Sequence, residues 1–546
     1  MLSSCIQLTA ILAFCFLFTH VHGFAKLFGH GIHRYELKEE GPSFADTINE
    51  TICPGDTVES IKIRYMPQVL DHFGGNSATW EQHYELNDRY WNNSTVGTHV
   101  FLLLGGEYTI TNTWVCNEGL TYMRAAKQHG ARVIQLSHRY FGPNRGLGDT
   151  SVDNLQYLTV EQVLHDTYHF IEKFNKQENM KNPKYVLFGG SWPGNIAAYM
   201  RVYFPNASQG AISSSSVLYP TVDAWQYAAT MEYVINKTSQ QCANDVTKAY
   251  ATMSSMILTD EGRANISEAF HLDPPLTNST NLDDDKNTVT SAIFDTFQGI
   301  VQYNHDGRNN DTKVGANFTV EKLCEKMTAN KNDLDKLYDV WSLVHHDKQG
   351  NTIPIISSYA KIVAGLKETS FDAPGASGRG WMWLCCSQVG YLQSTDSSTM
   401  FGSAAPLEWL KKFCGDIFDQ RVNASTIDEG VKKSQMKFGY PWTYNGSNVV
   451  FDSSEYDPWQ FGRVNSTNVE THVIAVMTPD VSHCASMYAM YDGEPEGLNA
   501  TRAVIFEQIG YYLELESTWK EPDAPSGAAC SVVGNMVLIF VVFLLK

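Results

Sequence analysis

The chain has 546 residues, of which 43% are hydrophobic and 18% are charged, and its formal net charge is −19. This composition supports a large buried core and excludes wholesale disorder. The negative charge argues against nucleic-acid binding, which needs a basic surface. The length exceeds that of one ordinary compact domain, so we expect two domains or one core with a large insertion.

The N-terminal segment is typical of a signal peptide. An apolar run from Ile6 to Phe18 is followed by Val21-His22-Gly23, which suits signal cleavage. The run is shorter than the ~20 residues of a membrane-spanning helix. We therefore expect residues 1–23 to be removed and the protein to enter the secretory pathway, where it becomes secreted, lysosomal or attached to the cell surface.

A surplus of N-x-[ST] triplets supports this route, because such triplets accept N-linked glycans in secreted proteins. The predicted glycosylation sites are Asn49, Asn93, Asn206, Asn236, Asn265, Asn278, Asn310, Asn317, Asn423, Asn445, Asn465 and Asn499.

The cysteines fit the same oxidising compartment. Of the 11 cysteines, Cys5 and Cys15 lie in the leader and Cys530 lies in the C-terminal tail. The rest form an even set, which suggests disulfide bonds whose pairing the sequence leaves open. These are Cys53, Cys116, Cys242, Cys324, Cys385, Cys386, Cys414 and Cys484. The cysteines lack the C-x-x-C spacing of zinc sites, so we do not expect a zinc site built on them.

Short apolar, β-branched runs bounded by Gly, Asn, Ser or Pro predict strands. In chain order they are Val100–Leu104, Arg132–Leu136, Tyr185–Phe188, Gly210–Ile212, Val449–Phe451 and Val473–Met477. Helical patterns separate several of them, for example at Val160–Phe174 and Ile196–Phe204. Alternating strands and helices indicate an α/β fold, with a mostly parallel sheet covered on both faces.

The middle of the chain has a different pattern. From about Ala224 to Trp341 the segments are longer, more polar and helical. We interpret this region as a helical cap inserted into the sheet. The predicted organisation is a first core part at 24–215, the cap at 216–355, a second core part at 356–517 and a tail at 518–546.

The sharpest local motif surrounds Ser191. The strand at Tyr185–Phe188 runs through Gly189 and Gly190 into this serine, and an amphipathic helix follows. This is the layout of a nucleophile elbow, in which small residues allow a sharp turn and the serine hydroxyl is exposed. Pro193 takes the place of the last glycine in G-x-S-x-G, and proline is tolerated in a first helical turn.

An acid and a histidine must follow the nucleophile in that order in an α/β-hydrolase. Asp457 follows the strand at Val449–Phe451, and His483 follows the strand at Val473–Met477. The histidine would take the serine proton, and the aspartate would orient and stabilise the imidazolium. Asp452 and Glu455 are rivals for the acid, and His472 is a rival for the base. We therefore expect Ser191, Asp457 and His483 to form a catalytic triad.

The C-terminal tail has the features of a glycosylphosphatidylinositol (GPI) anchor signal. Small residues at Ser526-Gly527-Ala528 precede a spacer and an apolar end, Val537–Leu545. The end is too short to span a bilayer. A processed GPI signal and an uncleaved tail both remain open, so membrane attachment through a GPI anchor is one expectation.

Ordered motifs along the chain carry a family resemblance. They are Gln68–Phe73, Trp80–Tyr84, Asn87–Trp91, Leu104–Glu107, His138–Gly142, Asn154–Asp166, the Ser191 elbow, Trp381–Gln393, Asp457–Trp459 and Ser482–Cys484. With these motifs, from about Gln68 to Leu515, the chain resembles the serine exopeptidases that include lysosomal Pro-X carboxypeptidase, a lysosomal dipeptidyl peptidase and thymus-specific serine protease. The details are most similar to the thymus-specific branch and its invertebrate relatives.

The resemblance implies an α/β-hydrolase core with a helical cap and cleavage of short, proline-containing peptides by a carboxypeptidase or dipeptidyl-peptidase activity. It implies no metal or organic cofactor. We expect Trp192 and Gly106 to provide the oxyanion hole, and Glu107, Gln388 and Trp459 to bind the peptide substrate. The peptide end that is trimmed and the assembly, including a homodimer, stay open.

Several residues depart from the family pattern. Tyr108 stands where Gly is usual and Ser137 where Glu is usual, while Leu384 and Gln388 replace a Gln and a Glu. These changes, with Pro193, support an alternative: a catalytically weakened, hydrolase-like secreted or surface protein that acts by binding. An esterase or lipase is disfavoured by the motifs.

Overall fold

The computed structural model describes residues 53, 60–91, 98–305, 319–346 and 350–519. The predicted signal peptide, the tail with its GPI signal and Cys530 lie outside these residues, as do four glycosylation sites, Asn49, Asn93, Asn310 and Asn317. Within the described part, no helix is both long and apolar enough to cross a membrane.

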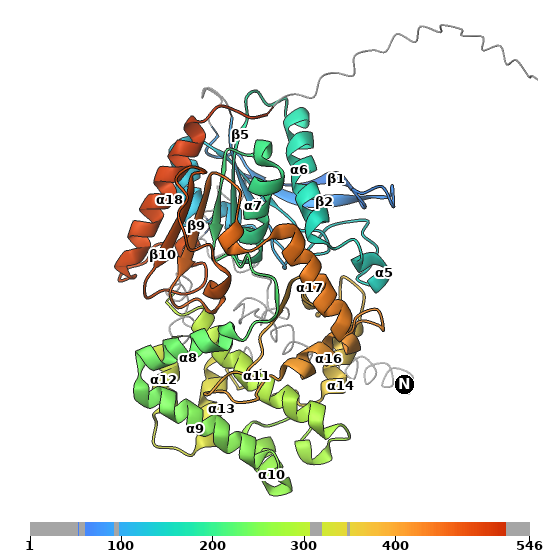
Figure 1. Ribbon diagram of the computed structural model, residues 1–546, viewed down its shortest axis with the longest axis vertical. Coiled ribbons are helices and arrows are strands. Elements are labelled where there is room, and N and C mark those ends of the chain that lie inside the picture. Colours follow the sequence, from blue (N-terminus) through green and yellow to red (C-terminus); the bar gives the residue numbers. More distant parts are fainter. Residues whose placement is uncertain (1–52, 54–59, 92–97, 306–318, 347–349, 520–546) are drawn as a thin grey trace, which may run out of the picture.

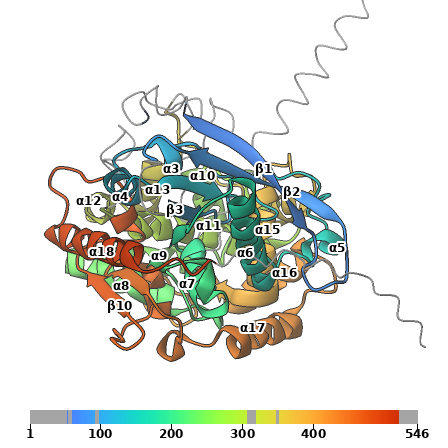
Figure 2. The same ribbon diagram turned by 90° about the horizontal axis from the view of Figure 1, so that it is seen from above.

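An eight-stranded sheet forms the upper half of the molecule in Figure 1, in the order β1-β2-β4-β3-β5-β6-β9-β10. The pairs β1–β2 and β2–β4 are antiparallel, and the remaining neighbours are parallel. The strands are β1 (Ile61–Val69), β2 (Thr79–Asn87), β3 (His99–Leu104), β4 (Arg132–Leu136), β5 (Lys184–Gly190), β6 (Gly210–Ser214), β9 (Val449–Ser454) and β10 (Val473–Thr478). Figure 2 shows β1 and β10 on opposite sides of the molecule, as the ends of this sheet.

The sheet confirms the α/β-hydrolase class and all six predicted strands. The sequence analysis missed β1 and β2, because their inward side chains include polar groups that hide the strand pattern. Gln68 of β1 and Gln82 of β2, for example, are both buried and hydrogen-bond each other at 2.7 Å.

Helices cover both faces of this sheet. The helices that accompany it are α3 (Thr113–Cys116), α4 (Thr121–His129), α5 (Val152–Leu155), α6 (Val160–Gln177), α7 (Trp192–Tyr203) and α18 (Glu496–Glu514). Phe101 and Leu103 of β3 pack in the cluster that contains α4 and α18 residues, whereas Leu102 and Leu104 pack in the cluster that contains α6 and α7 residues. Because alternate side chains of a strand point to opposite faces, one apolar strand supplies both cores.

A helical segment interrupts the sheet between β6 and β9. It comprises α8 (Gln226–Thr238), α9 (Gln240–Met256), α10 (Asp260–Ala269), α11 (Leu282–Gln302), α12 (Val320–Met327), α13 (Asp333–Val344), α14 (Tyr359–Lys367), α15 (Ala376–Leu384), α16 (Leu407–Ile417) and α17 (Ala424–Phe438). Helices α8 to α13 lie at the end of the molecule away from the sheet in Figure 1. A two-stranded parallel sheet, β7 (Thr221–Asp223) and β8 (Gly390–Leu392), joins its first and later parts.

The helical segment continues beyond residue 355, where we expected the second core part to begin. Four helices, α14 to α17, follow before the central sheet resumes with β9 at Val449. These helices are apolar because they share the large hydrophobic cluster with the sheet; Trp381 and Met382 of α15, for instance, belong to it. Their composition therefore resembled that of the core.

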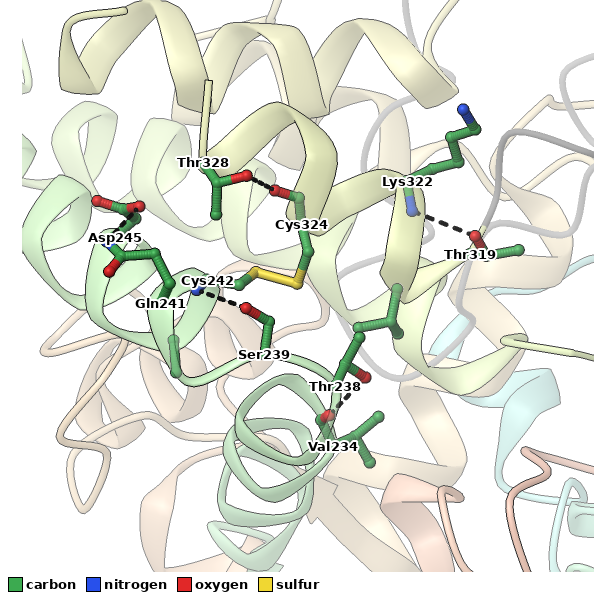
Figure 3. Close-up of a disulfide and its surroundings, with 12 residues drawn as sticks. Val234, Thr238, Ser239, Gln241, Cys242, Asp245, Thr319, Lys322, Cys324 and Thr328 are labelled. Carbon is green, nitrogen blue, oxygen red and sulfur yellow. Dashed lines mark hydrogen bonds between the residues drawn. A yellow bond between two sulfur atoms is a disulfide. The ribbon is translucent and has the colours of Figure 1, made fainter. Parts of the chain in front are cut away.

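Among the described residues there are three disulfides, Cys53–Cys116, Cys242–Cys324 and Cys386–Cys414. Cys242 and Cys324 tie α9 to α12 within the cap, and each helix begins at a hydroxyl cap, Ser239 or Thr319 (Figure 3). The prediction of disulfide bonds is confirmed, and two of the eight cysteines, Cys385 and Cys484, are buried free thiols.

Candidate active site

Ser191 occupies the turn between β5 and α7. Its backbone lies at φ 60° and ψ −129°, a region that costs a non-glycine residue ~1–3 kcal/mol. Its amide is held by a 2.8 Å hydrogen bond to the carbonyl oxygen of Ser214 in β6. A Cβ at Gly189 would overlap the backbone of Pro193, and one at Gly190 would overlap the side chain of Met487. The two glycines are therefore required for this turn.

Pro193 lies in the first turn of α7, where its missing N–H is not needed. Its ring contacts the loop after β3: a Cβ at Gly106 would lie 2.9 Å from Pro193 Cγ. The proline thus fills the space beside Gly106, and the β3 loop lies against the start of α7. In α/β-hydrolases these two segments supply the backbone N–H groups of the oxyanion hole, and its assignment to Trp192 and Gly106 here stays a prediction.

Asp457 and His483 lie in the loops after β9 and β10 and are bonded to each other. His483 Nδ1 donates to Asp457 Oδ2 at 2.8 Å, and both side chains are buried. Asp457 caps a short 3₁₀ helix, η8 (Pro458–Gly462), and its Oδ1 accepts the Trp459 amide at 2.9 Å. Two oxygens with separate partners fix the carboxylate, which in turn fixes the imidazole.

The second ring nitrogen of His483 points the other way. His483 Nε2 is buried and has no hydrogen-bond partner within the described part of the chain. The loop that carries it lies beside the serine turn, since a Cβ at Gly190 would lie 2.9 Å from Cys484 Sγ. Burial by itself lowers the pKa of His483, but the charge of Asp457 outweighs it and leaves that pKa well above the usual range.

The rival residues have other partners. Asp452 accepts hydrogen bonds from Ser214 Oγ at 2.6 Å and from Ser486 Oγ at 2.5 Å, and burial raises its pKa. Glu455 pairs with Lys237 at 2.9 Å, and His472 bonds Gln508 at 2.6 Å. Among the acidic candidates, Asp457 is the one that contacts a histidine at the carboxyl ends of the strands.

The cap holds the histidine loop through the end of α11. The His483 amide donates to the carbonyl oxygen of Gln302 at 2.9 Å, and Ser482 Oγ donates to that of Val301 at 2.9 Å. The side chain of Gln302 also accepts from Tyr227 at 2.6 Å and from the Trp459 indole at 3.2 Å. Sequence reasoning missed Gln302, because only tertiary contacts link it to both catalytic loops.

Glu107 is a buried carboxyl group in the loop after β3. Burial raises the pKa of Glu107 to about 7, while the nearby charge of His483 acts to lower it. The charge of Glu107 also acts on the Cys385 thiol, whose pKa is raised chiefly by burial. Glu107 therefore changes its charge near neutral pH, close to His483.

Two other predicted substrate-binding residues are engaged in structural contacts. Gln388 accepts the Val160 amide at 3.0 Å and donates to Leu158 O at 2.8 Å, so it caps the start of α6. Trp459 is buried and packs edge-on against Tyr227 and Tyr391. These contacts support the catalytic loop and the wall around it, and a role in binding substrate stays a prediction.

His138 is a further residue of the site that sequence reasoning did not select. Burial lowers its pKa to about 4, so the ring is neutral at physiological pH. Its Nδ1 bonds the Arg139 carbonyl at 2.8 Å and its Nε2 accepts the Trp192 indole N–H at 3.3 Å. These bonds fix the side chain that follows the serine.

Comparison with known proteins identifies the family by sequence. The family model "Serine carboxypeptidase S28" matches residues 68–505. A Caenorhabditis elegans protein whose name assigns it to the serine proteases is 34% identical over 87% of this chain and 88% of its own. Human lysosomal Pro-X carboxypeptidase is 25% identical over 80% of this chain and 85% of its own, and human thymus-specific serine protease is 24% identical over 89% and 92%.

Among solved structures, proline iminopeptidase of Mycobacterium smegmatis aligns with 83% of this chain and 99% of its own, at 12% identity and a TM-score of 0.34. The fold assignment rests on the strand order and the serine turn. The extent of the family match and the 34% identity to the nematode relative show which family the chain belongs to. The chain therefore belongs to the serine carboxypeptidase S28 family and is a serine peptidase.

Proposed function

We propose that the protein is an exopeptidase that cleaves short, proline-containing peptides through Ser191, Asp457 and His483. The observation that carries this proposal is the 2.8 Å bond from His483 Nδ1 to Asp457, with Nε2 beside the serine turn and unbonded to any group that the structure describes. The names of the Pro-X carboxypeptidase relatives support the preference for proline.

In the proposed mechanism Ser191 Oγ attacks the scissile carbonyl carbon while His483 Nε2 takes its proton. The oxyanion accepts hydrogen bonds from the Trp192 and Gly106 amides, each worth ~3 kcal/mol of barrier lowering. The C–N bond then breaks, and the imidazolium gives its proton to the leaving amine. A water molecule, deprotonated by the same histidine, hydrolyses the acyl-enzyme and restores the serine.

The cap supports exopeptidase action. Helix α11 ends against the His483 loop, and α8 contributes Tyr227 against Trp459. Helices at the carboxyl ends of the strands restrict approach and favour a chain end over a folded polypeptide.

The protonation of Glu107 bears on which end is trimmed. Below its pKa of about 7 the neutral acid can donate a hydrogen bond to a substrate carboxylate, and above it the carboxylate attracts an amino terminus. Glu107→Gln resembles the neutral form. If a carboxylate is bound, this variant keeps its activity and extends it above pH 7; if an amino terminus is bound, it loses activity at every pH.

The test has two parts. A fluorophosphonate probe should label the wild-type protein and not Ser191→Ala, and peptide hydrolysis should fall on the order of 10⁶-fold in that variant. Peptides blocked at the amino end, the carboxyl end or both are then incubated with the enzyme, and their products are identified by mass. Efficient cleavage of the doubly blocked peptide refutes the exopeptidase; no cleavage of any peptide by folded protein favours the binding-protein alternative.

We further propose that the protein travels the secretory pathway to lysosomes, the cell surface or the medium. The lysosomal name of the Pro-X carboxypeptidase relatives supports this route. So does the exposure of seven predicted glycosylation sites, Asn206, Asn236, Asn265, Asn423, Asn445, Asn465 and Asn499. The GPI anchor stays a prediction, tested by release from cells with phosphatidylinositol-specific phospholipase C. The homodimer also stays a prediction, tested by the mass of the purified protein in solution.

A further inference from the structure

We propose that His72, His165 and His169 form a binding site for a divalent transition-metal ion such as Zn²⁺. His72 lies in the loop after β1, and the other two lie one turn apart on α6. One ring nitrogen of each histidine lies within 4.8 Å of those of the other two. The triad is built from other segments, so this site would be additional to the catalytic centre.

The three rings lie together, and ring rotation is needed before their nitrogens converge on one ion. Residues four apart on a helix share a face, so His165 and His169 present their rings together. The His72 ring stacks on both, at 5.0 Å from His169 and 5.5 Å from His165. Tetrahedral zinc with Zn–N bonds of ~2.0–2.1 Å needs its nitrogens roughly 3.3 Å apart. Rotation of the partly exposed rings on α6 can supply this closure.

In two of the three histidines, one ring nitrogen contacts a carboxylate and the other is left for the ion. His72 Nε2 donates to Asp166 Oδ1 at 2.7 Å, which leaves Nδ1 for a metal. His169 Nδ1 lies 3.2 Å from Glu172 Oε2, which leaves Nε2. A carboxylate on the far nitrogen is the usual support of a metal-binding histidine, since it fixes the tautomer and makes the ligand more basic.

Asp166 is well suited to this supporting role. Arg139 binds both of its oxygens, at 2.6 and 2.7 Å, and the pair is buried. The carboxylate is thereby held in place to accept the hydrogen bond from His72.

The cluster is reached from solvent on one side. His72 is almost fully buried, whereas 38% of the His169 side chain is exposed, which gives an ion a path from solvent.

The choice of metal follows from the ligands. Three imidazole nitrogens suit Zn²⁺, Cu²⁺ or Ni²⁺ better than Mg²⁺ or Ca²⁺, which prefer oxygen. A bound ion would join the β1–β2 loop to α6 and so resist local opening of that edge of the sheet. We therefore expect binding to raise the melting temperature, with an increase that follows the logarithm of the free metal concentration once this exceeds the Kd.

The test is calorimetric titration of Zn²⁺ into the intact glycoprotein after removal of metal by chelation and dialysis. The wild type should bind one equivalent that His165→Ala/His169→Ala lacks, and Co²⁺ in place of Zn²⁺ should give visible absorption bands in the wild type alone. Glu172→Gln keeps all three ligands and should weaken binding by ~10–100-fold, so it tests the site without removing it.

His305→Ala is the matched control, because His305 also pairs with a carboxylate, Glu321 at 3.0 Å, but forms no such cluster with the residues that the structure describes. This control should retain the full equivalent of Zn²⁺ and the metal-dependent rise in melting temperature. Equal zinc binding by the wild type and His165→Ala/His169→Ala, or no binding by the wild type, overturns the proposal.

Discussion

The amide of His483 donates a 2.9 Å hydrogen bond to the carbonyl oxygen of Gln302, the last residue of α11. This bond joins the proposed catalytic base, which follows the last strand of the sheet, to a helix of the cap. The Gln302 side chain extends the connection to Trp459, next to Asp457. The cap therefore contributes to the position of both loops as well as covering them.

Replacing Gln302 with Leu should destabilise the protein and slow catalysis. The substitution leaves the Tyr227 hydroxyl and the Trp459 indole without their acceptor, at about 1–3 kcal/mol for each buried donor. Thermal melting measures the first effect, and kcat with a peptide substrate measures the second. Tyr227→Phe/Gln302→Leu removes one of the orphaned donors and should recover part of the stability. If Gln302→Leu has the melting temperature and the kcat of the wild type, the Gln302 side chain does not hold the two loops in position.

The two aspartates at the end of β9 should differ in their effect on activity. Asp457→Asn should lower kcat by ~10⁴-fold, as expected when the partner that fixes the histidine tautomer is removed. Asp457 raises the pKa of His483, so its neutralisation should move the acidic limb of the pH–rate profile to lower pH. Asp452→Asn should lower stability while the limb stays in place, because Asp452 bonds Ser214 and Ser486. If Asp452→Asn moved the acidic limb of the pH–rate profile and Asp457→Asn did not, Asp452 would be the acid that acts on His483.

Glu107 should make folding stability depend on pH. Its folded-state pKa, raised by burial from 4.5 to about 7, means that the folded protein holds this proton more tightly than the unfolded chain. The bound proton contributes on the order of 3 kcal/mol to the free energy of unfolding. This contribution is fully present below pH 4.5 and is lost as the pH rises through 7. Glu107→Gln removes this dependence. Urea unfolding of both proteins between pH 4.5 and 8 checks it, and parallel stability curves would contradict the prediction.

The Cys242–Cys324 disulfide should stabilise the cap. The bond closes a loop with a sequence separation of 82 residues, and its loss should cost about 2–5 kcal/mol through the greater freedom of the unfolded chain. Cys242→Ser/Cys324→Ser should therefore melt at a lower temperature. Cys385→Ser is the control, since Cys385 is a buried free thiol whose replacement opens no loop. Equal melting of the disulfide variant and the wild type would show that packing alone holds α9 and α12 together.

The sequence by itself predicted a serine hydrolase, its candidate triad and the strands that carry it. The turn at Gly189-Gly190-Ser191 is a local property, because only small residues fit beside Pro193 and Met487. The order of Ser191, Asp457 and His483 is linear along the chain, and each follows a buried apolar strand that the pattern alone predicts. Parallel strands then bring their carboxyl ends to the same edge of the sheet.

Only the tertiary structure decided which polar residues meet. Asp452 and Asp457 are alike in sequence, and they differ because one bonds two serines and the other a histidine. The polar strands β1 and β2, the true end of the helical insertion, the contact of Gln302 with His483 and the cluster of His72 with α6 all join segments distant along the chain. A sequence pattern shows which residues of one helix or strand are buried. These contacts depend instead on how separate elements pack together.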